Sequence, residues 1–204
     1  MQVKIVDAIM GSGKTTAMIN HINNAGDDVK FLYITPYLAE ADNVIRSCPT
    51  KKFRQPEAYG SKINGIKHLF EKGHNIVSTH ALFKSFDGEI IDLAYKNNYV
   101  LIMDEVADVI CQSDLTGDDV KIILDNYAVI EDGYRLTWTD RKYKGALTKY
   151  KELCDLGCIG VYGGCIALQL FPISIFKGFK EIYVLTYLFE AQLQKYYFES
   201  NHGN

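Results

Sequence analysis

A glycine-rich turn near the start of the chain is the stretch best suited to chemistry. It runs from Ala8 to Thr15 as AIMGSGKT, between an apolar segment at 3–7 and a helical pattern at 14–25. Glycines let consecutive backbone N–H groups converge on an anion, and the N-terminus of the following helix adds partial positive charge. The turn predicts phosphate binding; the alternative is an ordinary strand-to-helix turn that happens to carry this sequence.

Lys14 and Thr15 extend the prediction from a phosphate to a nucleotide with its cation. In such a loop the lysine reaches the β- and γ-phosphates and the hydroxyl binds Mg²⁺. Ala8 stands where the usual pattern has its first glycine, so the strict pattern is met at three of its four positions. We predict ATP and Mg²⁺ as cofactors and Lys14 as a catalytic residue. The predicted nucleotide contacts are Ala8, Met10, Gly11, Ser12, Gly13, Lys14, Thr15 and Thr16.

Two acids, Asp104 and Glu105, follow the uninterrupted apolar run at 99–103. Carboxylates at the end of a buried strand are costly unless they meet a cation or take part in chemistry. Beside a phosphate loop, Asp104 is expected to share the Mg²⁺ with Thr15, and Glu105 to polarise the attacking water. The alternative is that Asp104 only caps a helix, a position that suits aspartate.

The remaining sequence supplies the elements that must position these residues. We expect strands at 29–35, 75–79 and 181–186, and helices at 37–47, 63–72, 89–96, 116–126, 141–156 and 189–197. Alternating residues at 127–139 predict a hairpin around Glu131-Asp132-Gly133. Strands that alternate with helices are typical of an α/β fold, with a mostly parallel sheet and helices on both faces. We expect a single domain over 1–204 with a small hairpin insertion at about 127–176.

Charge and cysteine content narrow the class of protein. The formal net charge is −3, which argues against a pervasive basic surface and confines any nucleic-acid contact to a local patch. The basic groups at 51–54 and 141–156 are such patches, or simply solvated surfaces. Five cysteines, an odd number, fit a reducing compartment, and the chain enters a strand at once, so we expect a cytoplasmic protein. Cys154, Cys158 and Cys165 lack the paired spacing of zinc sites and are interpreted as packing residues.

One uncharged stretch, 158–176, is long enough to span a bilayer. Glycines, Gln169 and Pro172 interrupt it, and it lacks the flanking aromatic or basic belt of a membrane span. A buried strand, a glycine turn and a core helix explain it better, and no membrane partner is expected.

The order of the motifs resembles the first RecA-like domain of superfamily 2 DNA helicases and translocases, particularly the short DEAD-like helicases of phages. AIMGSGKTT is similar to motif I, in which alanine is common at the first position, and Asp104-Glu105 is similar to motif II. Leu185-Thr186-Tyr187 stands where motif III falls. The resemblance covers nearly the whole chain and implies a RecA-like P-loop NTPase fold with ATP-driven movement of nucleic acid.

The same resemblance implies a DNA contact and a second domain. Ile34-Thr35-Pro36 and the segment at 78–82 stand where the family contacts the nucleic-acid backbone, which assigns single-stranded or forked DNA to Thr35, Pro36, Thr79 and His80. The family completes its ATP site with a second RecA-like domain. We expect this domain in cis or in trans, and weak or no activity from the present chain without it. A phage-encoded protein of this kind would act in the host cytoplasm.

The sequence departs from the family pattern at two motifs and leaves two other functions open. Ala107 replaces the Asp or His at the fourth position of motif II, and motif III keeps only Thr186. The family's upstream adenine-reading element is also expected to be absent. The alternatives are a nucleoside kinase of the thymidine kinase type, against which the unpaired cysteines speak, and a non-catalytic ATP-binding module that regulates a partner helicase.

Overall fold

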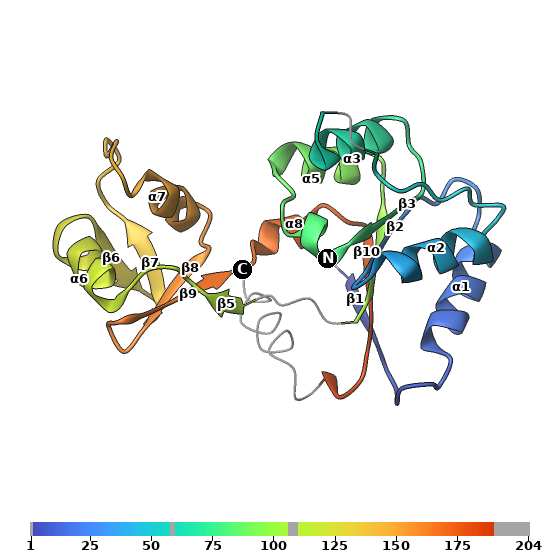
Figure 1. Ribbon diagram of the computed structural model, residues 1–204, viewed down its shortest axis with the longest axis horizontal. Coiled ribbons are helices and arrows are strands. Elements are labelled where there is room, and N and C mark those ends of the chain that lie inside the picture. Colours follow the sequence, from blue (N-terminus) through green and yellow to red (C-terminus); the bar gives the residue numbers. More distant parts are fainter. Residues whose placement is uncertain (1, 58–59, 106–109, 190–204) are drawn as a thin grey trace. The chain divides into compact units, whose positions relative to one another are not determined.

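The computed structural model describes residues 2–57, 60–105 and 110–189 (Figure 1). The chain divides into two compact units. Met1–Ala107 together with Ile173–Asn204 form the first, and Asp108–Pro172 form the second. We call them the parallel-sheet unit and the antiparallel-sheet unit after the sheets they contain.

The parallel-sheet unit has five strands in the order β1-β10-β4-β2-β3, and every neighbouring pair is parallel. The bounds are Gln2–Asp7 for β1, Phe31–Thr35 for β2, Ile76–Thr79 for β3, Val100–Asp104 for β4 and Glu181–Thr186 for β10. All five residues of β2 and the first four of β4 are buried, as expected for strands covered by helices on both faces. The predicted α/β fold with a mostly parallel sheet is therefore confirmed.

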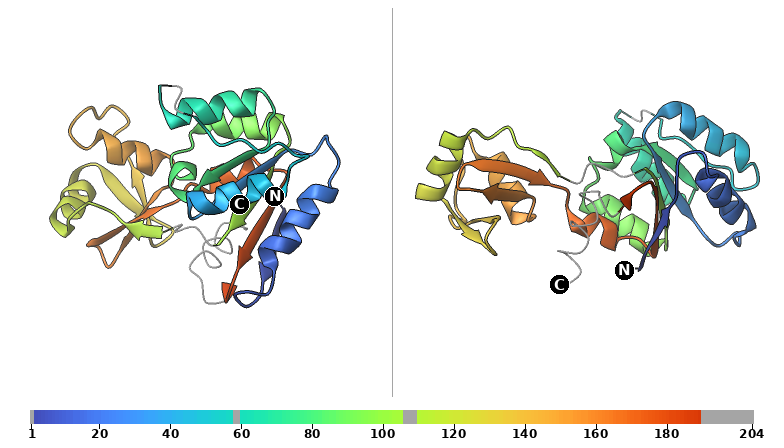
Figure 2. Two further views of the ribbon diagram at one scale, coloured as in Figure 1. Left: turned by 45° about the vertical axis from the view of Figure 1, so that its right-hand side comes forward. Right: turned by 90° about the horizontal axis from the view of Figure 1, so that it is seen from below.

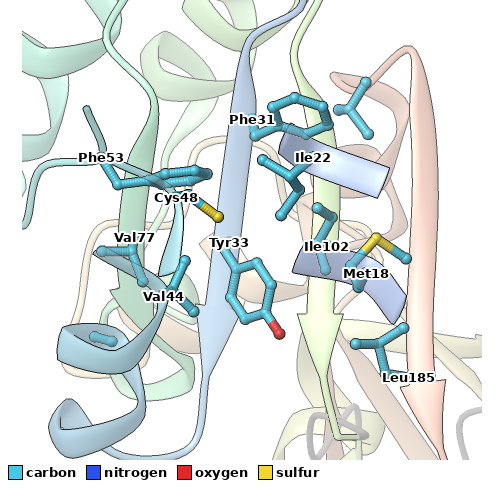
Figure 3. Close-up of a cluster of buried hydrophobic side chains, with 12 residues drawn as sticks. Met18, Ile22, Phe31, Tyr33, Val44, Cys48, Phe53, Val77, Ile102 and Leu185 are labelled. Atoms are coloured by element: carbon cyan, nitrogen blue, oxygen red, sulfur yellow. The ribbon is translucent and has the colours of Figure 1, made fainter. Parts of the chain in front are cut away.

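Helices pack on both faces of this sheet (Figures 1 and 2). One face carries α1 (Lys14–Asn24) and α2 (Leu38–Ser47). The other carries α3 (Lys62–Glu71), α4 (His80–Phe83), α5 (Gly88–Lys96) and α8 (Ile173–Lys177). Beneath α1 and α2 lies a buried cluster that includes Met18, Ile22, Tyr33, Val44 and Ile102 (Figure 3).

The antiparallel-sheet unit contains a second sheet, in the order β5-β9-β8-β7-β6. Its strands are β5 (Ile110–Gln112), β6 (Ala128–Glu131), β7 (Arg135–Trp138), β8 (Ile159–Tyr162) and β9 (Ile166–Leu170). The helices α6 (Gly117–Asn126) and α7 (Thr148–Asp155) pack with it around a core of their own. The hairpin predicted at 127–139 is present as β6 and β7, and its turn contains Asp132 and Gly133 at φ 52° and 79°.

Several expectations for this unit need correction. The expected insertion began near 127, whereas the unit spans Asp108–Pro172 and holds five strands rather than a hairpin. The helix predicted at 141–156 is wrong in its first half, because α7 begins at Thr148. Tyr143 instead packs its ring against Trp138 and Tyr127, at 5.2 Å and 4.8 Å between centroids. These contacts hold the segment before α7 in a turn rather than a helix.

The uncharged stretch folds as β8, a turn at Gly163 and Gly164, β9 and then α8, close to the predicted strand, turn and helix. None of the helices in the described part of the chain has the length and apolar character that crossing a membrane requires. Cys154 and Cys158 are buried, as expected of packing residues, but Cys165 is exposed in the turn before β9. Most of the helix predicted at 189–197 lies outside the described residues.

Candidate functional site

All the predicted site residues of the chain lie at one edge of the parallel sheet. Parallel strands have their carboxyl ends on the same side, and each apolar strand here ends in a polar residue. These terminal residues are Asp7, Thr35, Thr79, Asp104 and Thr186. Ligands of open α/β sheets bind at this edge, so the topology collects the candidate residues where a ligand can reach them.

The glycine-rich turn after β1 has the backbone of an anion cradle. Gly11 and Gly13 have φ of 76° and 85°, the left-handed region that favours glycine. Gly13 is also the N-cap residue of α1, and among the described residues no side chain caps this helix end or places an acid in its first turn. The first N–H groups of a helix lack intrahelical partners, so this end can bind an anion through them.

Lys14, the first residue of α1, folds back over the turn. Its Nζ donates to the carbonyl oxygens of Ala8 and Ile9, at 2.5 and 3.1 Å. The N–H of Ala8 in turn donates to Thr186 O at 3.1 Å, which fixes the start of the turn to the end of β10. Phosphate oxygens are stronger acceptors for an ammonium group than carbonyls are, so Lys14 can exchange these partners for a phosphate.

Asp104 joins the turn to the neighbouring strand. Its Oδ2 accepts hydrogen bonds from Thr15 Oγ1 at 3.3 Å and from Tyr33 Oη at 2.8 Å. Its backbone carbonyl lies 3.0 Å from His80 Nε2, at the start of α4. The structure therefore brings together the two predicted metal ligands, Thr15 and Asp104, which are 89 positions apart in the sequence.

Glu105, the predicted water-polarising residue, is exposed beside Asp104. Its backbone has φ 68°, uncommon for a residue with a side chain, and its N–H donates to Leu185 O at 2.9 Å. The bond to β10 holds this unusual conformation at the end of β4. Both acids of the predicted pair thus have backbone positions set by neighbouring elements rather than by a loop alone.

A cavity of about 580 Å³ opens beside these groups. Its lining residues come from the glycine-rich turn, α2 and the ends of β4 and β10: Met10, Gly11, Lys14, Thr15, Glu40, Asn43, Val44, Asp104, Glu105, Leu185, Thr186 and Tyr187. Of the other predicted contacts, Ser12, Gly13 and Thr16 are exposed on the same loop and helix start. A volume of this size is typical of small-molecule sites.

Three carboxylates face this cavity. Burial, followed by the charges of Asp104 and Glu105, raises the pKa of Glu40 above its ordinary value. Oxygen ligands from a hydroxyl and carboxylates suit Mg²⁺, which proteins commonly hold by one or two carboxylates together with substrate phosphates. The donor set fits the predicted cation, and Lys14 faces the same cavity to meet a phosphate.

Sequence reasoning missed three residues of this edge. Tyr33 and Glu40 reach Asp104 and the cavity from β2 and α2, which only the strand order brings alongside β4. Asp7 accepts the N–H groups of Leu188 and Phe189 at 2.9 and 3.0 Å, and Leu188 has φ 55°. An acid next to the phosphate turn was the available signal for Asp7, and nothing in the sequence pointed to its partners.

The residues assigned to nucleic acid lie at the predicted edge, but two of their side chains are engaged within the protein. Thr35 is buried and its Oγ1 donates to Tyr37 O at 2.7 Å. Thr79 Oγ1 accepts the N–H of Leu82 and caps α4. Pro36 and His80 are half-buried, and the side chain next to Pro36, Tyr37, is 69% exposed. Surface contacts of this loop would therefore come from Tyr37 rather than from Thr35.

The basic cluster at 51–54 is also partly structural. Lys51 is buried, and its Nζ donates to Ala25 O at 2.6 Å and Gly26 O at 3.2 Å, just beyond the end of α1. Phe53 is buried in the core. Only Lys52 and Arg54 of this cluster remain exposed for a phosphate.

Comparison with known proteins finds a phage-derived relative. Over 214 residues the chain is 36% identical to the SPbeta prophage-derived uncharacterized protein YonV of Bacillus subtilis (strain 168). The match covers 98% of this chain and 52% of YonV, so the chain spans about half the length of this relative. No family model matches the chain, and no solved structure does.

Proposed function

We propose that the parallel-sheet unit binds and hydrolyses ATP with Mg²⁺ and is the nucleotide-binding domain of a superfamily 2 type DNA helicase or translocase. The hydrogen bond between Thr15 and Asp104 is the observation that carries the proposal. It joins the phosphate-loop hydroxyl to the acid after the central strand, at the wall of a cavity that Lys14 also lines. An ordinary strand-to-helix turn has no need of this partner.

Each residue has a role that its position permits. The N–H groups at the start of α1 and the ammonium of Lys14 bind the phosphates, with Lys14 leaving the carbonyls of Ala8 and Ile9. Thr15 and Asp104 hold the Mg²⁺, which supplies charge neutralisation of the phosphates when it is bound. Glu105 accepts a hydrogen bond from the attacking water and orients it toward the γ-phosphate.

Binding of Mg-ADP measured by calorimetry tests the nucleotide site. Lys14→Ala removes a charge-assisted phosphate contact and should weaken binding about ten-fold or more. Lys121→Ala is the matched control, because Lys121 is an exposed lysine of the antiparallel-sheet unit. Equal affinities for the wild type and Lys14→Ala would contradict the proposal.

The second RecA-like domain is proposed to cover the same edge of the sheet. Six large apolar side chains in the segments that follow β1, β2 and β10 are each at least 43% exposed: Ile9, Met10, Tyr37, Leu38, Tyr187 and Leu188. Contiguous exposed apolar side chains commonly mark an interaction site. The greater length of YonV supports a further domain in the same polypeptide, and a separate chain is the alternative.

A further inference from the structure

We propose that Tyr33 is a positioning residue that holds the Asp104 carboxylate in place for the cation and so sets the Mg²⁺ dependence of nucleotide binding. The inference rests on the proposed nucleotide site. It assigns a role within that site to a residue of β2, a strand that contains none of the predicted nucleotide contacts.

The position of Tyr33 follows from the sheet register. Tyr33 pairs with Ile102 of β4, and Asp104 lies two residues further along the same strand. Side chains alternate along a strand, so Ile102 and Asp104 point to the face on which Tyr33 lies. Figure 3 shows the ring of Tyr33 among the side chains beneath α1 and α2, with its hydroxyl directed toward the carboxyl end of β4.

Tyr33 is a rigid donor, since its side chain is completely buried. Its hydroxyl is 2.8 Å from Asp104 Oδ2, a shorter contact than the 3.3 Å from Thr15 Oγ1 to the same oxygen. Thr15 is in the first turn of α1 and must exchange this hydrogen bond for the cation when a nucleotide binds, whereas Tyr33 is fixed in the core. Tyr33 can therefore keep the carboxylate oriented while Thr15 changes its partners.

A neutral donor suits this role better than a charged one. A lysine or arginine at this place would cancel the negative charge that attracts the cation, whereas a phenol orients the carboxylate and leaves its charge intact.

The competing explanation is that Asp104 merely satisfies a buried hydroxyl. Tyr99 provides the comparison within the same unit. It is also completely buried, and its hydroxyl donates to the backbone carbonyl of His74 at 2.5 Å, two residues before the start of β3 and so at the opposite edge of the sheet from the carboxyl ends. Tyr33→Phe and Tyr99→Phe remove the same atom from the same kind of environment, and only the first should affect the cation.

The experiment measures ADP affinity of the 204-residue chain by calorimetry, once with excess Mg²⁺ and once with EDTA. For Tyr33→Phe we expect affinity about ten-fold weaker than wild type in Mg²⁺ and changed by less than about two-fold in EDTA, as for loss of one hydrogen bond to a charged group. For Tyr99→Phe we expect no change in either condition. In an Asp104→Asn background, Tyr33→Phe should cause no further loss, because the two residues act as one unit.

Each other outcome overturns the inference. If Tyr33→Phe weakens binding equally in Mg²⁺ and EDTA, or matches Tyr99→Phe, then Tyr33 is only a core residue. If Tyr33→Phe still lowers affinity in the Asp104→Asn background, it does not act through Asp104. If the wild type binds no ADP in Mg²⁺, both the proposed function and this inference are wrong. A different result would separate the two proposals: the wild type binds ADP, Asp104→Asn weakens the binding and Tyr33→Phe does not. In that case the proposed function remains and only the role of Tyr33 is ruled out.

Discussion

The two units have five-stranded sheets but distribute their polar groups differently. In the parallel-sheet unit all five strands end at one edge, so Asp104 meets Thr15 and Tyr33 there. In the antiparallel-sheet unit neighbouring strands run in opposite directions, and their ends are divided between two edges. Strand direction and strand order together therefore gather residues distant in sequence into one site in the parallel sheet.

The carboxylates at the cavity are a further property of the parallel-sheet unit. In both units exposed charges pair with one another, as Lys149 does with Asp114 at 3.0 Å in the antiparallel-sheet unit and Lys4 with Glu181 at 2.8 Å in the parallel-sheet unit. In the parallel-sheet unit Glu40, Asp104 and Glu105 line one cavity with the same sign of charge. Like charges that share a cavity attract a cation, whereas exposed pairs satisfy each other and contribute little.

The largest expected effect is the low ATPase rate of the present chain. An arginine finger contributes a factor on the order of 10³ to 10⁵ in enzymes of this kind. The chain has four arginines, Arg46, Arg54, Arg135 and Arg141, and none is among the described residues that line the cavity. We expect very slow turnover, no stimulation by single-stranded DNA and no strand displacement. Robust DNA-stimulated turnover by the purified chain would show that the site is complete without another domain.

The next largest effect is on ATP cleavage, which should depend on an acid of the parallel-sheet unit and not on one of the antiparallel-sheet unit. Glu105→Gln keeps the size of the side chain and removes its ability to accept a proton, so single-turnover ATP cleavage should fall on the order of 10²-fold or more while ATP still binds. Glu131→Gln, an exposed acid of the antiparallel-sheet unit, should leave cleavage unchanged. If Glu105→Gln cleaves ATP at the wild-type rate, Glu105 does not polarise the water.

The local features of the site could be predicted from the sequence because each is contiguous. The glycine-rich turn, Lys14 and the Asp104-Glu105 pair are short motifs next to apolar strands, and the structure places them at one cavity. Tyr33 could not be found this way, since a tyrosine within an apolar segment predicts only a buried core residue. Its role depends on β2 lying beside β4, which is a property of the strand order.

The incorrect sequence predictions also arose from contacts between residues distant in the sequence. Lys51 looks like a surface charge, yet it is buried and its ammonium donates to two backbone carbonyls just beyond α1, 25 and 26 positions earlier, as well as pairing with Asp27. The basic segment after Arg141 looks helical, yet Tyr143 is held in the aromatic cluster with Trp138 and delays the helix to Thr148. In both cases the local sequence pattern is real, but a tertiary contact determines the structure instead.

A buried and an exposed lysine should differ in their effect on stability. Lys51→Met keeps the apolar stem but removes the ammonium donor from the Ala25 carbonyl, and it also breaks the contacts of Nζ with Gly26 O and Asp27 Oδ1. The Gly26 carbonyl still accepts the N–H of Val29, so the Ala25 carbonyl accounts for most of an expected loss of about 2 kcal/mol in the free energy of unfolding. Lys149→Met breaks an exposed pair with Asp114 and a contact of its ammonium with the Tyr150 ring at 5.3 Å, both of which contribute little at the surface, so the unfolding midpoint should shift much less. Urea denaturation measures both, and equal midpoints for the two variants would mean that Lys51 contributes no more than a surface charge.

The smallest expected effects come from two glycines with similar backbones, Gly13 at φ 85° and Gly133 at φ 79°. A Cβ at either position meets nothing within 4 Å, so the cost of alanine is conformational, about 1 kcal/mol at each site. The two variants should therefore lose similar stability in urea. Only Gly13→Ala adds a methyl group to a turn whose backbone must approach a phosphate, so it alone should weaken Mg-ADP binding in calorimetry. Equal nucleotide affinities for Gly13→Ala and Gly133→Ala would mean that the left-handed glycines of both units serve chain reversal alone, and the functional contrast between the units would then rest on Lys14 and the carboxylates.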